Sequence, residues 1–182
     1  SNWRTQAMHV AAKLNLADLL AEGPRTHSDL ANVTNTNAGA LRRLLAALCS
    51  LGVCTEEDDG RFAITPLGRT LSGNARCSVK SWALFWGVSA YPSWSNFLYS
   101  VQTGKSGREL LTGQKTFAHL SSDPHIAALF NQGMAELTRL VSMEVPRAYD
   151  FAGKRVMDVG GGYGQLLQVT GQKGVGRQEV LQ

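Results

Sequence analysis

The feature that most constrains this chain is an apolar run followed directly by clustered glycines, VMDVGGGYG at residues 156–164. The run Val156–Val159 predicts a strand, and residues 165–168 return to a helical pattern. A strand, a glycine turn and a helix in this order open a nucleotide-type site in an α/β fold. Glycines at 160, 162 and 164 allow positive φ and let a ligand lie against bare main chain. The spacing lacks the third glycine of the dinucleotide fingerprint, which argues against a pyrophosphate cofactor and favours a smaller adenosine ligand. A plain turn is the alternative.

The segment DVGGGYG at residues 158–164 resembles the first motif of class I methyltransferases, which use S-adenosylmethionine (SAM). From about residue 7 to 167 the chain resembles the SAM-dependent small-molecule O-methyltransferase family, which includes plant caffeate-type and bacterial members. The resemblance implies a mainly α N-terminal winged-helix dimerisation domain, followed by the first β-α unit of an incomplete Rossmann-like α/β domain. It also implies SAM as the cofactor and a homodimer as the assembly.

Composition narrows the class of protein. With 182 residues, 43% hydrophobic and 18% charged, the chain is long enough for one or two globular domains. The net charge of +4 is spread along the chain, which argues against a nucleic-acid partner. The three cysteines form no C-x-x-C pair, which favours a reduced, cytoplasmic setting. No apolar stretch approaches about 18 residues, so we expect no membrane span. The four histidines have no metal-ligand spacing, and we expect no metal site.

The N-terminal third reads as helices followed by a hairpin. Cap and stop signals divide the helices, and a charged turn at 56–60 joins two short strands. In chain order we expect a helix over residues 7–20 that ends before Gly23-Pro24, a short helix capped by Thr26, a helix that begins after 35–37 and ends at Gly52, and strands at Val53–Thr55 and Arg61–Thr65.

A helix, turn, helix and wing pattern has two functional interpretations. A winged-helix DNA-binding transcription regulator needs base- and phosphate-seeking side chains on its second helix. Arg42 and Arg43 are present, but Ala46 and Ala47 suit close helix packing, and the acidic wing repels phosphate. We therefore favour a docking module. A non-catalytic dimerising remnant is a further alternative.

An aromatic segment spans Ser78 to Tyr99. Trp82, Phe85 and Trp86 share one helical face. Ordinary core packing is one interpretation. The other is a flat apolar wall for a planar aromatic substrate.

A strong helix start follows at Asp123-Pro124, with Asp as the N-cap and Pro at the first helical position. We expect this helix to reach about Tyr149, with a kink or break at Pro146. Phe130, Met134 and Thr138 are spaced four residues apart and fall on one face, which core packing alone would also explain.

The segment FNQGM at residues 130–134 resembles the F-N-x-G-M segment of the family. The resemblance implies that Phe130, Met134 and Phe117 line the acceptor pocket. It also implies that Thr138 contacts the carboxylate end of SAM and that Asp158, Gly160 and Gly162 bind SAM. His119 stands where the family usually has Tyr.

The chain departs from the family after Leu167. The family continues to a second apolar strand ending in an acidic residue that binds the ribose hydroxyls. Here Glu179 lies at nearly the right distance but follows no apolar run. The resemblance therefore implies a truncated, inactive form, with the general base expected beyond the C-terminus and no catalytic residue to name.

The resemblance, together with these patterns, implies a SAM-dependent O-methyltransferase that acts on a small aromatic hydroxyl compound. The expected division is a winged-helix-like dimerisation domain at 1–100, a helical linker and acceptor-pocket segment at 101–150, the start of the SAM-binding Rossmann-like domain at 151–168, and a disordered tail at 169–182.

Overall fold

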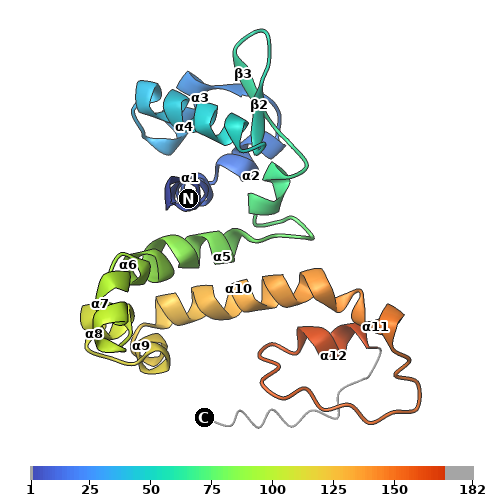
Figure 1. Ribbon diagram of the computed structural model, residues 1–182. Helices are drawn as coiled ribbons and strands as arrows, with labels where there is room; N and C mark the ends of the chain where they lie inside the picture. The colour runs from blue at the N-terminus through green and yellow to red at the C-terminus, as the bar shows by residue number, and fades with distance from the viewer. Residues whose placement is uncertain (1, 171–182) are drawn as a thin grey trace.

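The computed structural model describes residues 2–170, apart from the side chains of Thr116 and Phe117. The chain is mainly helical and carries one small antiparallel sheet (Figure 1). The N-terminal helices and the sheet form one packed unit. Below it in the view, α5 and the long helix α10 lie side by side, and the glycine segment lies beyond α10.

Four helices build the N-terminal unit: α1 (Asn2–Lys13), α2 (Leu16–Ala21), α3 (His27–Thr34) and α4 (Ala38–Ser50). The prediction of one helix over residues 7–20 is wrong, because Asn15 takes a left-handed conformation with φ of 55° and separates α1 from α2. Asn tolerates this region better than other residues with a side chain. The bend lets Leu16 and Leu20 point into the core, where both are buried.

The predicted Thr26 cap and the helix start at 35–37 are confirmed, and Asn37 is the cap of α4. Thr26 Oγ1 accepts a hydrogen bond from Asp29 N at 3.1 Å, and Asn37 Oδ1 accepts one from Ala40 N at 2.9 Å. Each bond satisfies a backbone donor that the first helical turn leaves free. Gly52, with φ of 74°, follows the end of α4 as expected.

The sheet has the strand order β1-β3-β2, from β1 (Arg25–Thr26), β2 (Cys54–Glu56) and β3 (Arg61–Ile64). Cys54 pairs with Ile64, and Arg25 pairs with Phe62. The two predicted strands are confirmed, while β1 was not predicted because two residues carry no alternating pattern. Phe62 is fully buried between the sheet and the helices, in a core whose largest members are Leu16, Leu30, Leu45 and Leu48.

Short helices then carry the chain away from this unit. They are η1 (Gly68–Leu71), α5 (Lys80–Phe85), the π-helical turn η2 (Trp86–Ala90), α6 (Tyr91–Trp94), α7 (Phe97–Thr103), α8 (Gly107–Thr112) and α9 (Thr116–Ser122). Helix α5 packs between α1 and α10, so it joins the N-terminal unit to the rest of the chain.

Helix α10 (Pro124–Ser142) begins as predicted. Asp123 Oδ1 accepts hydrogen bonds from His125 N at 3.0 Å and Ile126 N at 3.1 Å. The predicted extent to about Tyr149 is wrong, because α10 ends at Ser142 and a separate helix α11 (Val145–Ala148) follows. Pro146 explains the break, since its ring excludes the carbonyl four residues earlier, which belongs to Ser142.

The predicted strand at Val156–Val159 does not form. These residues belong to no sheet, and Met157 and Val159 are 85% and 84% exposed. A strand needs a neighbour to accept its backbone hydrogen bonds, and the sheet of the described residues lies in the N-terminal unit. The first β-α unit is therefore present only as its helix, α12 (Gln165–Val169). The predictions for residues 171–182, Glu179 included, lie outside the described residues.

Within residues 2–170, no helix is both long and apolar enough to cross a membrane.

Candidate functional site

The candidate site has two parts, the C-terminal half of α10 and the glycine turn that leads into α12. Figure 1 shows α12 alongside this half of α10, and the two helices are in contact. Arg139 Nε donates a hydrogen bond to Gln165 Oε1 at 3.5 Å, at the first residue of α12. The predicted SAM residue Thr138 therefore precedes Arg139, which contacts the residue directly after the glycine turn.

The glycine turn has the backbone that the sequence predicts. Gly160, Gly162 and Gly164 have φ values of 74°, 54° and 70°, which L side chains rarely adopt. A Cβ built on any of the three meets nothing within 4 Å, so the space against the turn is open. A Cβ on Gly161 would lie 2.3 Å from Asp158 Oδ2. The Asp158 carboxylate therefore folds against the turn, and a side chain at position 161 would displace it.

The predicted acceptor residues lie on α10 and α9. The Phe130 ring packs against Phe85, with 5.3 Å between centroids, and is partly buried. Met134 is 41% exposed, and Thr138 is half-buried. Phe117 lies in α9, and its side chain is not among the described ones. The two cavities found in the described chain are lined by other residues.

Aromatic rings continue from Phe130 along α5. Phe85 stacks on Trp82 at 5.6 Å, and Trp82 meets Trp86 edge-on at 6.0 Å. These three rings share a face, as the spacing predicts, and Phe85 is buried. The aromatic series thus links α10 to the N-terminal unit.

Glu136 was not predicted from the sequence to be structurally important, although it is a carboxylate on α10 that is only 4% exposed. Its Oε1 accepts a hydrogen bond from Ser81 Oγ at 2.8 Å, and its Oε2 accepts one from Ser81 N at 3.0 Å. Gly133 lies one turn earlier, and a Cβ there would approach a Trp82 ring carbon to 3.0 Å. Gly133 and Glu136 lie three residues apart on a largely apolar helix, and this pattern is the sequence signal that could have indicated the contact with α5.

A second buried charge, Arg108, also escaped the sequence reading. It is 8% exposed and donates to Ser89 Oγ at 2.6 Å and to the Ser89 carbonyl at 3.1 Å. Burial lowers the pKa of this guanidinium from its ordinary value. The contact fastens α8 to the π-helical turn. Within residues 2–170, no group of His, Cys, Asp and Glu side chains could hold a metal ion.

A helical N-terminal unit is followed by a long helix and a left-handed glycine turn, and family models match both parts of the chain. Residues 1–74 match the O-methyltransferase dimerisation domain, and residues 94–173 match the O-methyltransferase domain. The chain belongs to the O-methyltransferase family.

Individual relatives support this assignment. The chain is 40% identical to a phenazine O-methyltransferase from Lysobacter antibioticus over 91% of its own length and 49% of the relative's. The crystal structure of LaPhzM matches with a TM-score of 0.84 and 40% identity, over 91% of this chain and 50% of that one. The O-methyltransferase NcsB1, solved with SAM and 2-hydroxy-5-methyl naphthoic acid, matches with a TM-score of 0.72 and 29% identity, over 92% and 52%. The chain therefore spans about half the length of the relatives that it matches.

Proposed function

We propose that this protein takes part in SAM-dependent methylation of a hydroxyl group on a small aromatic compound. The observation that carries the proposal is the glycine turn, in which three left-handed glycines leave open backbone directly before a helix that contacts α10. Two of the relatives are named for a phenazine or solved with a naphthoic acid, which are both aromatic molecules.

The turn residues suit the methionine end of SAM. Open backbone at Gly160 and Gly162 allows close approach, and the Asp158 carboxylate offers an acceptor for an ammonium group. Thr138 offers a hydroxyl on the neighbouring helix, where it would donate to the SAM carboxylate. When bound, SAM supplies a methyl group on a sulfonium centre, and the residues named here would hold and orient it.

The acceptor would lie against Phe130 and Met134, with Phe117 as a further wall. Aromatic rings and a thioether adapt to a planar ring without demanding one shape. In the transfer, the acceptor oxygen bonds to the methyl carbon, the carbon–sulfur bond breaks, and S-adenosylhomocysteine leaves. The hydroxyl proton passes to a general base, and no described residue is assigned to that role. Proximity and alignment are the protein's main contributions.

We also propose the finer organisation of the fold. Helices α2, α3 and α4 with strands β1–β3 have the order of a winged helix. Residues 1–100 would serve dimerisation, 101–150 the acceptor side, and 151–168 the start of the SAM-binding domain. Chain order and the packing of the elements support this division.

A homodimer is part of the proposal. The dimerisation-domain match supports it, and so do large apolar side chains exposed on α6, α7 and α8. These are Trp94, Phe97, Leu98, Val101, Leu110 and Leu111, each at least half exposed. A second copy would cover them, and an intertwined obligate interface buries about 2,000 Å² or more. Light scattering at micromolar concentration should give twice the monomer mass, and a monomer would refute the dimer.

We propose no nucleic-acid partner. Arg42, which would have to face phosphate, is paired with Glu56 of the hairpin at 3.2 Å. A gel-shift assay should show no complex at physiological salt. We propose a cytoplasmic location on the argument from the cysteines alone, and a fluorescent fusion would test it.

The deciding experiment is calorimetry with SAM. The 182-residue chain should bind SAM weakly or not at all, because the glycine turn follows no strand and lies exposed. A chain extended to the length of the relatives should bind SAM and transfer its methyl group. There, Gly162→Val should weaken SAM binding about tenfold or more.

A matched control is Gly60→Val, which adds the same side chain at another left-handed glycine, in the β2–β3 hairpin. It should leave SAM affinity unchanged. Equal losses in both variants would refute the role of the turn. An extended chain that binds SAM without transferring methyl would favour a dimerising remnant.

A further inference from the structure

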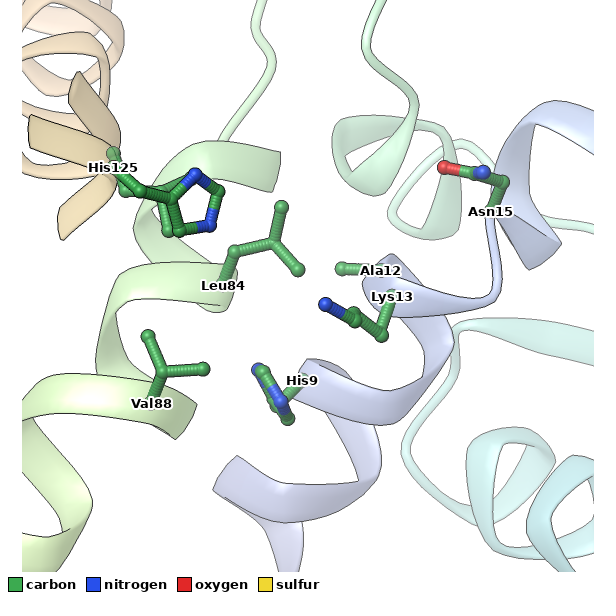
Figure 2. A pocket seen from close by; sticks show the side chains of 8 residues that line it. His9, Ala12, Lys13, Asn15, Leu84, Val88 and His125 are labelled. Atoms are coloured by element: carbon green, nitrogen blue, oxygen red, sulfur yellow. The ribbon is translucent and has the colours of Figure 1, made fainter.

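A cavity of about 120 Å³ lies between α1, the α5–η2 segment and α10 (Figure 2). Leu84 and Val88 form its apolar wall. The opposite wall carries His9, Lys13 and Asn15 from the end of α1, and His125 reaches in from α10. Figure 2 shows the ring of His9 and the terminal nitrogen of Lys13 turned toward the space beside Leu84 and Val88.

The polar groups of this cavity lack partners. Across residues 2–170, no hydrogen bond or ion pair engages the side chain of His9, Lys13, Asn15 or His125. His9 Nδ1 is a buried polar atom without a partner. No carboxylate lines the cavity. A buried polar group without a partner is costly, and a lysine charge without a counter-charge attracts an anion.

The position of His9 is fixed by the backbone opposite. A Cβ at Gly87 would lie 2.0 Å from His9 Cγ, so the ring rests against the bare main chain of η2. The imidazole is thus held at the cavity instead of being free to swing into solvent. Lys13 and His125 are exposed and leave a path of entry.

We propose that this cavity binds a small carboxylate with a compact apolar body. The carboxylate would lie between Lys13 Nζ and the His9 ring, and the apolar body would lie against Leu84 and Val88. An apolar cavity of about 150 Å³ holds benzene, so 120 Å³ has room for about half a dozen heavy atoms. The site is separate from the glycine turn and does not depend on the proposed methyl transfer.

The test is an NMR titration of the full 182-residue chain with butyrate, observing the histidine ring signals. The His9 and His125 signals should shift together along one saturable curve, while His27 and His119 should not follow it. Butyramide has the same shape without the charge and should bind about tenfold more weakly or worse. Inorganic phosphate lacks the apolar body and should also bind more weakly than butyrate.

Lys13→Met keeps the length of the side chain and removes its charge. It lies on the surface, so the fold should survive, and butyrate affinity should fall about tenfold or more. Lys105→Met, at an exposed lysine after α7, is the matched control and should bind butyrate as the wild type does. Equal affinity for butyramide, tighter binding of phosphate, equal losses in both lysine variants, or no saturable shift would each overturn the proposal.

Discussion

Glu136 on α10 caps the N-terminus of α5 through Ser81, accepting hydrogen bonds from the Ser81 backbone N–H at 3.0 Å and the Ser81 hydroxyl at 2.8 Å. A carboxylate at a helix N-terminus satisfies free backbone donors and interacts well with the helix dipole. The bond joins two segments separated by 55 residues. It sets α10, which carries Phe130 and Met134, against the helix that contacts the N-terminal unit.

Glu136→Ala should therefore be strongly destabilising. It leaves the half-buried backbone donors of Ser81 and Trp82 without their acceptor, at a cost of about 2–3 kcal/mol in the free energy of unfolding. Glu136→Gln keeps one acceptor oxygen and should cost about half as much. Urea denaturation at an unchanged m-value measures both. Glu144→Ala is the control, because Glu144 is exposed and paired only with Arg147. A Glu136→Ala variant as stable as the wild type would refute the capping role.

Asp18 should make stability depend on pH. Its Oδ2 accepts a hydrogen bond from Lys80 Nζ at 2.5 Å, and its Oδ1 accepts from Ser72 Oγ and from Gly73 N. Burial works to raise the pKa of this carboxyl, but the hydrogen bonds and charge of Lys80, with the bonds from Ser72 and Gly73, lower it below its ordinary value.

A lowered folded-state pKa means that the stabilisation is complete above the unfolded value of about 3.9 and is lost as pH falls through the folded value. Asp18→Asn should cost about 1–2 kcal/mol at pH 7. The difference in free energy of unfolding between this variant and the wild type should shrink below about pH 4. Asp58→Asn, at an exposed hairpin residue, should show no such gap. Parallel stability curves for wild type and Asp18→Asn down to pH 2 would contradict the prediction.

The three cysteines should differ in reactivity. Cys54 is 2% exposed, and burial, together with the hydrogen bond to Cys49, raises the pKa of its thiol. Cys77 is exposed. A thiol reagent at pH 8 should modify Cys77 in the native chain well before Cys54, and urea should remove the difference. Mass spectrometry of the labelled peptides gives the order, with Cys77→Ser as the control. Equal rates in the folded chain would contradict the burial of Cys54.

Met134→Ala should cost little stability, about 1 kcal/mol or less, because the side chain is 41% exposed on α10. Leu45→Ala, at a fully buried position of the N-terminal core, should cost about 2–5 kcal/mol. Thermal or urea unfolding compares the two. In a chain extended to the length of its relatives, Met134→Ala should raise the KM for the acceptor. A large loss of stability with unchanged acceptor kinetics would assign Met134 to the core instead of the pocket.

The sequence correctly predicts features that depend only on residues close together in the chain. The caps Thr26, Asn37 and Asp123 act on backbone donors a few residues away, so residue type and spacing predicted where these three helices begin. The glycine turn at 160–164 was predicted for the same reason, since only its own φ angles decide it. The motifs around Phe130 and Asp158 also indicated the family that the comparisons established.

Features that depend on contacts between distant segments could not be predicted from the sequence. The Val156–Val159 run has the composition of a strand, but a strand exists only with a neighbour, and no described segment pairs with it. Asn15 breaks the first helix because burying Leu16 and Leu20 requires the bend. Glu136 and the cavity at His9 depend on helices far apart in the chain coming together. The energy of such contacts comes from desolvation and packing between distant residues, so only the tertiary structure decides them.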